Sequence, residues 1–283
     1  MKDSEAEKNL HRQIAATYTW EERKNWYGQA ADAYNRVRPR YPKQLVDRVV
    51  ELAQLSRELS PGAKLLEVGC GPGTATTAFA QRGFQLVGLE PSWQSCLLAR
   101  QNCAPYPNVE IINTTFEEWQ LEAEKFQAVL SATAFHWVAA EIRHQKAADA
   151  LQERGFLILL WNTPPKPNAE IEQLLDEVYR QRAPSLKRVE DIASHEKNIS
   201  KFGWDVIDSG LFENLQSEQL VLETTYSIED YLALLSTLSQ YIMLEPQQRD
   251  FLFAGLREVL ENRLGNSINL SYLSVFQVAQ KTV

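Results

Sequence analysis

The chain has 283 residues, of which 44% are hydrophobic and 23% are charged. This composition is ordinary for a folded globular protein and excludes a wholly disordered chain. At this length we expect one large α/β domain, or one domain with a smaller embedded part. The formal net charge is −8. It argues against broad binding to nucleic acids, because such binding needs a basic face that neutralises phosphates.

The cysteines and the apolar segments indicate where the protein resides. Cys70, Cys96 and Cys103 are too few for a disulfide framework, and they lack the paired spacing of a zinc site. Residues 1–10 contain no apolar segment of the kind found in a secretory signal. The longest apolar run, residues 156–161, is far shorter than the roughly 20 residues that span a membrane. We therefore expect a cytoplasmic protein with reduced thiols, no metal site and no membrane partner.

Predicted strands and helices alternate regularly from residue 64 to residue 161. Residues 1 to about 26 are polar and predict a loose arm or helix. The prolines in residues 38–42 interrupt helical structure. A new helix is expected to begin at Pro42. The expected strands cover residues 64–68, 85–89, 109–113, 126–131 and 156–161, and the expected helices cover residues 74–82, 91–102 and 141–153. This order indicates βαβ units, which form a parallel sheet with helices on both faces.

The alternation stops after residue 161, where a proline-rich connection follows. The expected helices now cover residues 169–182, 228–238 and 246–264, the expected strands cover residues 220–225 and 268–279, and residues 183 to about 214 are expected to be irregular. Apolar residues recur at helical spacing in the late helices. We expect these helices to form a cap over the sheet instead of an independent domain.

A glycine-rich loop follows the first predicted strand and leads directly into a helix. It contains Gly69, Gly71 and Gly73. Glycines allow a sharp turn and let a ligand approach the backbone, and a helix start offers unpaired N–H groups. In open α/β sheets, ligands bind outside the carboxyl ends of the strands. Dinucleotide dehydrogenases use a related loop, but their third glycine would fall at Thr74 in this chain.

Two acidic residues accompany this loop. Glu67 lies just before it, and Glu90 follows the second predicted strand. A carboxylate at the second position can accept hydrogen bonds from both hydroxyls of a ribose. The alternative is that Glu90 only caps the helix that begins at Pro91. Together with the glycine loop, Glu90 favours a nucleoside-containing ligand.

These segments resemble the motifs of class I S-adenosylmethionine-dependent methyltransferases. The resemblance is carried by residues 66–74, 87–92, 108–118 and 126–138, and it covers about residues 25–162. Within the class, the chain is similar to the methyltransferase type 11-like, small-molecule branch that includes trans-aconitate methyltransferases, through Tyr34, residues 38–42 and the pair His136 and Trp137. The resemblance implies a Rossmann-like, doubly wound, mainly parallel seven-stranded sheet with helices on both faces and an α-helical cap.

The resemblance also implies S-adenosyl-L-methionine as cofactor and S-adenosyl-L-homocysteine as product. The residues that it places at the cofactor are Glu67, Gly69, Cys70, Gly71, Gly73, Glu90, Pro91, Thr115, Phe116, Glu117, Ser131 and Ala132. The family usually has aspartate where this chain has Thr115, as acceptor for the adenine amino group. A threonine hydroxyl accepts a hydrogen bond but carries no charge. Glu117 is the alternative acceptor. A second departure is Gln127, where the family usually has aspartate.

Two residues are candidates for handling the methyl acceptor. His136 follows the fourth strand and is the candidate general base; the alternative is that it begins a short helix with Trp137 and forms a wall of the site. Arg38 is the candidate anchor for an acidic substrate, because guanidinium matches carboxylate in a bidentate way. Its alternative role is an ion pair that holds the N-terminal arm. Tyr27, Tyr34 and Tyr41 form either an aromatic lid or ordinary packing.

The sequence therefore predicts a methyltransferase that acts on a small molecule, with a carboxylic acid as the preferred acceptor class. The alternatives are a catalytically silent S-adenosylmethionine-binding protein and an NAD-dependent oxidoreductase. We expect residues 1–42 to form an arm over the cofactor site, residues 43–162 to form the cofactor-binding core, and residues 163–283 to form the cap and the final strands. The acceptor atom stays open, and so does the choice between monomer and homodimer.

Overall fold

The computed structural model describes residues 28–55, 62–186 and 192–283 of the chain. The expected N-terminal arm, residues 1–26, and Tyr27 of the expected lid lie outside the described residues. Within the described part, no helix is long and apolar enough to cross a membrane. No cluster of three or more metal-ligating side chains occurs among the same residues.

A seven-stranded sheet forms the centre of the molecule, with the strand order β3-β2-β1-β4-β5-β7-β6. The strands are β1 (Lys64–Val68), β2 (Gln85–Leu89), β3 (Val109–Ile112), β4 (Phe126–Ala132), β5 (Leu151–Asn162), β6 (Phe212–Ser227) and β7 (Ser267–Lys281). Strands β1 to β5 run parallel, and β7 lies antiparallel between β5 and β6. This confirms the predicted doubly wound, mainly parallel fold.

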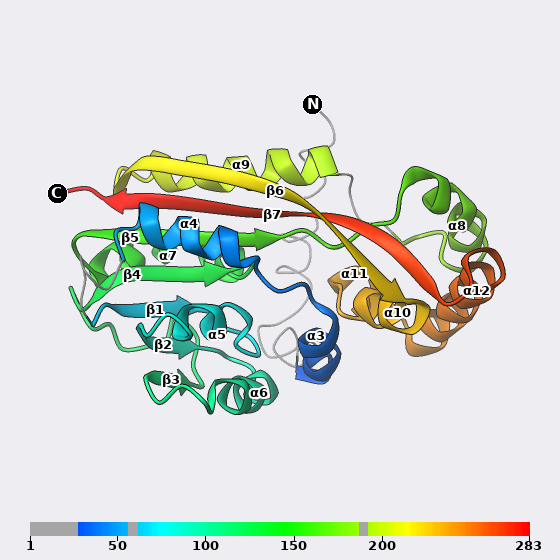
Figure 1. Cartoon of the computed structure of the whole chain (residues 1–283), viewed down its shortest axis with the longest axis horizontal. Coiled ribbons are helices and arrows are strands. Elements are labelled where there is room, and N and C mark those ends of the chain that lie inside the picture. The colour runs from blue at the N-terminus through cyan, green and yellow to red at the C-terminus, as the bar shows by residue number, and fades with distance from the viewer. Residues whose placement is uncertain (1–27, 56–61, 187–191) are drawn as a thin grey trace.

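Helices cover both faces of the sheet (Figure 1). On one face, α4 (Lys43–Leu52) and α5 (Thr74–Ala80) share an apolar cluster with Leu65 and Leu86. On the other face, α7 (Ala140–Ala150) and α9 (Ile192–Asp208) share a cluster with Leu66 and Val87. Because neighbouring residues of β1 and β2 point to opposite faces, both faces need apolar side chains, and these strands are therefore almost continuously hydrophobic.

The remaining helices gather beyond the carboxyl ends of the parallel strands (Figure 1). They are α3 (Ala31–Val37), α8 (Ala169–Arg182), α10 (Ile228–Ser236), α11 (Ser239–Ile242) and α12 (Pro246–Leu264). Their buried side chains form a separate apolar cluster with residues of β7. The hydroxyl groups of Tyr179 and Tyr241 hydrogen-bond across it at 2.8 Å. Helix α6 (Trp93–Cys103) packs beside the edge strand β3 and also contacts α3 and α5.

Several element boundaries differ from the sequence expectation. The expectation that residues 183–214 are irregular is wrong, because they include α9 and the first residues of β6. Helix α9 in fact carries apolar residues at helical spacing, because Ile192, Ile199, Phe202, Val206 and Ile207 all pack on the cluster of this face, and the sequence analysis overlooked this pattern. Strand β6 begins at Phe212, whereas the sequence predicted a start at residue 220. The first half of β6 lies exposed at the sheet edge and is not apolar, so the apolar pattern did not reveal it. Helix α7 ends at Ala150, and β5 follows without a loop.

Candidate cofactor site at the carboxyl edge of the sheet

The glycine loop turns the chain from β1 into α5 at the carboxyl edge of the sheet. Gly69, Gly71 and Gly73 have φ angles of 70°, 55° and 85°, which lie in the left-handed region that favours glycine. The N–H groups of Gly69 and Cys70 donate to the carbonyl of Leu89 at 2.9 and 3.0 Å. The loop is therefore fixed to the end of β2, and Gly73 lies at the start of α5.

The atoms that surround Gly69 and Gly71 show which of the two glycines is required for packing and which one faces open space. A Cβ atom built on Gly69 would lie 2.5 Å from Cβ of Ala134, so glycine is required there for packing. A Cβ atom built on Gly71 would meet no atom within 4 Å. The backbone of Gly71 is thus open to an approaching group, as a cofactor cradle requires.

Glu90 connects the glycine loop with the start of α6. Its Oε2 accepts a hydrogen bond from the N–H of Gly71 at 2.9 Å, and its Oε1 accepts from the N–H of Ser92 at 2.8 Å. The residue is 8% exposed. Glu90 therefore makes the contact at the start of α6 that the sequence left as an alternative to ribose binding. The hydrogen bond from Gly71 also holds the carboxylate directly beside that glycine.

Glu67 lies in β1 behind the same loop and is completely buried. The hydroxyl of Thr76 donates to its Oε2 at 2.6 Å, whereas its Oε1 has no hydrogen-bond partner among the described residues. Burial raises the pKa of this carboxyl from 4.5 to about 8, and the nearby Glu90 adds to the increase. An unsatisfied buried oxygen costs about 1–3 kcal/mol, so it marks a position where a ligand group is expected.

The residues predicted for the adenine side follow β3. The hydroxyl of Thr115 accepts from the N–H of Glu118 at 2.9 Å, and the buried ring of Phe116 stacks on Trp119 at 6.2 Å. Glu117 does not join them, because its Oε1 accepts from the N–H of Ala139 at the start of α7 at 2.9 Å. This contact disfavours Glu117 as the substitute for the aspartate that the family usually has.

Asn113 is a further candidate for the site that the sequence analysis did not name. Its Nδ2 donates to the carbonyl of Glu90 at 2.8 Å and to the carbonyl of Pro91 at 2.9 Å. The sequence feature that could have indicated Asn113 is its position directly after β3, next to the end of β2 where Glu90 lies. Because Asn113 holds the backbone around Glu90, it fixes where that carboxylate lies.

The end of β4 lines the same edge. The hydroxyl of the buried Ser131 donates to the carbonyl of Val68 at 2.8 Å, and Ala132 ends the strand. Thr133 follows with a left-handed φ of 54°. Its hydroxyl lies 3.1 Å from the hydroxyl of Tyr41, which is buried in the apolar cluster of α4 and α5, as ordinary packing would place it, so the aromatic lid stays a prediction.

His136 lies in a short 3₁₀ helix (Phe135–Trp137), as the alternative interpretation expected. Its ring lies 4.9 Å from Trp137, 5.7 Å from Trp161 and 6.0 Å from Phe202, measured between centroids. Trp161 and Phe202 stack on each other at 5.0 Å. These contacts give His136 an aromatic environment between the end of β5 and α9, so its role as a base stays a prediction.

Arg38 connects the segment after α3 with the end of α10. Its Nε donates to the hydroxyl of Thr237 at 2.8 Å, and its Nη2 donates to the carbonyl of Thr237 at 3.0 Å. The guanidinium also lies 4.9 Å from the ring centroid of Tyr34. In the structure Arg38 therefore holds α3 against the cap, through hydrogen bonds instead of the ion pair considered as its alternative role.

The same segment also contacts the glycine loop. Nη1 of Arg40 donates to the hydroxyl of Thr74 at 3.0 Å. Nδ2 of Asn102 donates to Oδ1 of Asn35 at 3.0 Å and to the carbonyl of Pro72 at 2.8 Å. The segment from α3 to α4 thus joins the cofactor edge to the cap.

Replacing Arg38 by methionine should lower the free energy of unfolding by about 1–3 kcal/mol, because two hydrogen bonds from a charged group are lost. Arg36→Met is the matched control on the same helix, since Arg36 forms an exposed ion pair with Asp230 at 3.3 Å. Such pairs contribute about 0–1 kcal/mol. Urea unfolding of both variants checks this, and equal losses would contradict the role of the Thr237 contacts.

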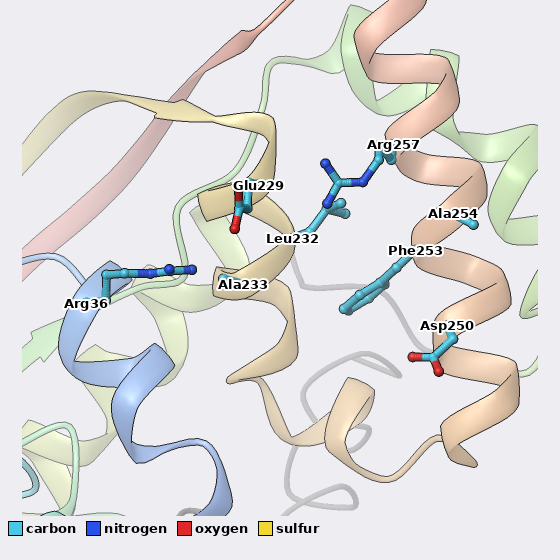
Figure 2. Close-up of a pocket in the computed structure, with 8 residues that line it drawn as sticks. All are labelled: Arg36, Glu229, Leu232, Ala233, Asp250, Phe253, Ala254 and Arg257. Atoms are coloured by element: carbon cyan, nitrogen blue, oxygen red, sulfur yellow. The ribbon is translucent and has the colours of Figure 1, made fainter.

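A pocket of about 400 Å³ lies in the cap, between α3, α10 and α12 (Figure 2). Arg36 points into it from α3, and Phe253 and Arg257 point from α12 toward α10, where Glu229 lies (Figure 2). Charged groups of both signs thus surround an apolar floor. None of the predicted site residues lines this pocket, so the candidate cofactor site is a different one, at the sheet edge.

The fold has known counterparts among methyltransferases. The solved structure of a putative type II methyltransferase from Anaeromyxobacter dehalogenans superimposes with a TM-score of 0.58, covering 86% of this chain and 97% of that chain. The sequence identity is 17%, so this likeness concerns the fold. Together with the strand order and the glycine loop, it defines the class I methyltransferase fold.

The sequence comparisons match part of the chain to methyltransferases. Residues 65–155 match the family described as a methyltransferase domain. An uncharacterized methyltransferase of Mycobacterium tuberculosis is 30% identical over 163 residues, which cover 58% of this chain and 63% of the relative. A probable S-adenosylmethionine-dependent methyltransferase of Saccharomyces cerevisiae is 28% identical over 126 residues, which cover 43% of this chain and 42% of the relative. The matches thus span less than two thirds of these relatives. Residues 65–155 therefore match a methyltransferase domain, and the prediction of a methyltransferase is confirmed, whereas the finer likeness to trans-aconitate methyltransferases stays a prediction.

Proposed function

We propose that this protein transfers a methyl group from S-adenosylmethionine to a small-molecule acceptor. The observation that supports the proposal most is the convergence of three features at one sheet edge. They are the open backbone of Gly71, the carboxylate of Glu90 that accepts from it, and the unsatisfied oxygen of the buried Glu67. An open glycine, an acceptor for hydroxyl groups and an acceptor for a cation fit the parts of this cofactor.

The residues would then divide the task of holding the cofactor. Gly69, Gly71 and Gly73 would lie along its amino-acid and ribose parts, Glu90 would accept from the ribose hydroxyls, and Thr115 would face the adenine. The bound cofactor supplies an activated methyl group on its sulfonium. Positioning of two reactants can contribute on the order of 7–11 kcal/mol to such a transfer. The described residues therefore need mainly to orient the acceptor and exclude water.

The acceptor is proposed to be a small carboxylic acid. The support is the resemblance to trans-aconitate methyltransferases, and Arg38 stays the proposed anchor although two of its nitrogens donate to Thr237. A carboxylate acceptor is already an anion and needs no general base, whereas a hydroxyl acceptor would need one, for which His136 is the candidate. We also propose that residues 43–162 hold the cofactor, that residues 1–42 form an arm over it, and that residues 163–283 form the cap and the final strands.

Isothermal titration calorimetry with S-adenosylhomocysteine tests the binding part of this proposal. We expect micromolar affinity, and absence of binding to the folded protein at millimolar ligand would contradict the proposal. Titration with NADH tests the oxidoreductase alternative, for which we expect no binding. Labelled S-adenosylmethionine and a library of di- and tricarboxylic acids then test the transfer. Binding without transfer to any acceptor in a cell extract would indicate a catalytically silent protein.

A further inference from the structure

Strand β6 forms one border of the sheet, and three strands lie between it and β1 with the glycine loop (Figure 1). It spans 16 residues, whereas strands in globular proteins average about 5–6 residues. Its one irregularity of register lies early, between Glu213 and Gln216, so the part from residue 217 onward is regular. A long regular edge strand presents a row of backbone N–H and C=O groups onto which another strand can add.

The hydrogen bonds of β7 show which backbone groups of β6 face this border. Val221 lies opposite Leu273 of β7. The N–H of Leu273 donates to the hydroxyl of Thr163, and its C=O accepts from the N–H of Thr163, both at 2.9 Å and on the side of β5. Because an antiparallel ladder alternates bonded and non-bonded pairs, the N–H and C=O of Val221 point away from β7. Gln219 and Glu223 follow the same alternation. Within the described part of the chain, no hydrogen bond satisfies these outward groups.

An apolar segment lies in the middle of the regular part of β6. Val221 is 66% exposed, although it lies well inside the strand. Leu220 and Leu222 flank it on the opposite face and are half-buried. Polar residues follow on both sides, and β6 contains neither lysine nor proline, two residues that protect edge strands from pairing. Water thus reaches an apolar side chain at a position where the backbone can pair.

This segment is complementary to itself when a second copy of it runs antiparallel with Val221 opposite Val221. Apolar residues then face apolar residues, and polar residues face polar residues. The facing pairs are Leu220 with Leu222, Gln219 with Glu223, Glu218 with Thr224 and Ser217 with Thr225. No glutamate faces a glutamate, which would be unfavourable. A twofold interface uses the same surface on both copies, so it requires this kind of self-complementarity.

The neighbouring registers fit less well. Outward-facing residues must oppose each other, so the twofold axis can move only by whole residues, to Leu220 or to Leu222. An axis at Leu220 would place Val221 opposite Gln219, and an axis at Leu222 would place it opposite Glu223. Only the axis at Val221 among these three pairs every apolar residue of the segment with another.

We propose that β6 pairs antiparallel with β6 of a second copy of this chain, about a twofold axis at Val221, so that two sheets join into one continuous sheet. Each facing pair of outward residues exchanges two backbone hydrogen bonds, and the two Val221 side chains leave water together. The cofactor edges of both copies stay accessible, because three strands lie between β6 and β1. The dimer therefore does not depend on the proposed methyl transfer. It selects the homodimer from the two states that the sequence left open.

The net charge gives this dimer a characteristic salt dependence. Each copy carries a formal charge of −8, so two copies repel each other at long range. The facing pairs of the proposed register contain no ion pair that salt could weaken. Salt screens the repulsion, so dimerisation should strengthen between about 0.05 M and about 0.5 M NaCl. A dimer that weakens over this range would contradict the proposed pairing.

Sedimentation velocity of the full chain at about 1–100 µM measures the association, and we expect a dimer whose fraction rises with concentration. Val221→Lys places two ammonium groups opposite each other at the axis and should weaken the dimer by about tenfold or more. Val283→Lys is the matched control, because Val283 is 93% exposed and lies outside β6. It changes the net charge by the same amount and should leave the dimer unchanged. Circular dichroism checks that both variants fold.

Cross-linking through Val221→Cys tests the register without adding a charge. The Cα atoms of a hydrogen-bonded antiparallel pair lie about 5.5 Å apart, which is within the range that a disulfide spans. The three cysteines of the chain are buried, so mild oxidation should act on the introduced thiol. Val221→Cys should form a covalent dimer. Glu223→Cys, whose thiol would face Gln219 of the second copy, should not.

A wild-type protein that stays monomeric at the highest concentration and at both salt concentrations would overturn the proposal, and the border of β6 would then be open to a strand of a different protein. A dimer that Val221→Lys leaves as stable as the wild type would overturn it as well, because that dimer uses another surface. If Val221→Lys does not fold, the comparison of Val221→Cys with Glu223→Cys still tests the pairing, and equal cross-linking of the two would contradict it. These measurements involve no cofactor, so their failure leaves the proposed function unaffected.

Discussion

Replacing Gly71 by alanine is expected to lower the affinity for S-adenosylhomocysteine by about 100-fold or more, equivalent to at least about 2.7 kcal/mol. The loss of folding stability should be only about 1–2 kcal/mol. The φ angle of Gly71 is 55°, which strains an alanine, but a Cβ atom there meets nothing within 4 Å. The added methyl group would instead occupy the space that the cofactor needs.

Two other glycines provide matched controls. Gly210, in the turn between α9 and β6, has a φ of 72° and equally open surroundings, so Gly210→Ala measures the backbone strain alone. Gly69 has a φ of 70°, but its Cβ atom would lie 2.5 Å from Ala134. Gly69→Ala should therefore destabilise the fold most of the three. Chemical denaturation and calorimetry distinguish these effects, and a Gly71→Ala protein with wild-type affinity would exclude the proposed cradle.

The part of the site that the sequence predicted is the part that depends on local chemistry. A buried strand, three glycines and the first residue of a helix lie within eleven consecutive positions, residues 64–74, and each acts on its immediate neighbours. Helix α8 (Ala169–Arg182) and helix α12 (Pro246–Leu264) match their expected ranges for a similar reason. Each has a start signal in the sequence, Asn168 as N-cap and Pro246 at the first position.

The contacts that the sequence did not predict join segments that are far apart in the chain. Arg38 and Thr237 are separated by 199 positions, and nothing near either residue indicates the other. Helix α9 has apolar residues at helical spacing, but its place against β6 and β7 depends on those distant strands. Glu117 was considered as an adenine acceptor, but tertiary packing turns it toward α7. In each case the partner, and not the local pattern, decides where the side chain lies.

Replacing Glu90 by glutamine is expected to weaken S-adenosylhomocysteine binding by about 30- to 300-fold, or about 2–3.4 kcal/mol. The carboxylate accepts from the N–H groups of both Gly71 and Ser92. A glutamine has a single acceptor oxygen, so its NH₂ group would face one of these donors. The variant should therefore disturb the glycine loop and also lose the charge that would hold the ribose hydroxyls. Calorimetry with the wild-type and variant proteins measures the total loss.

The two roles of Glu90 can be separated by changing the ligand instead of the protein. If Glu90 accepts from the ribose, the wild-type protein should bind 5′-methylthioadenosine at least about tenfold more tightly than its 2′-deoxy analogue, which is about 1.4 kcal/mol. The Glu90→Gln variant should lose most of this preference. If Glu90 only braces the loop through Gly71 and Ser92, the variant should bind both ligands more weakly by the same factor. An unchanged preference would therefore assign Glu90 to the architecture of the loop, whereas a lost preference assigns it to the ribose.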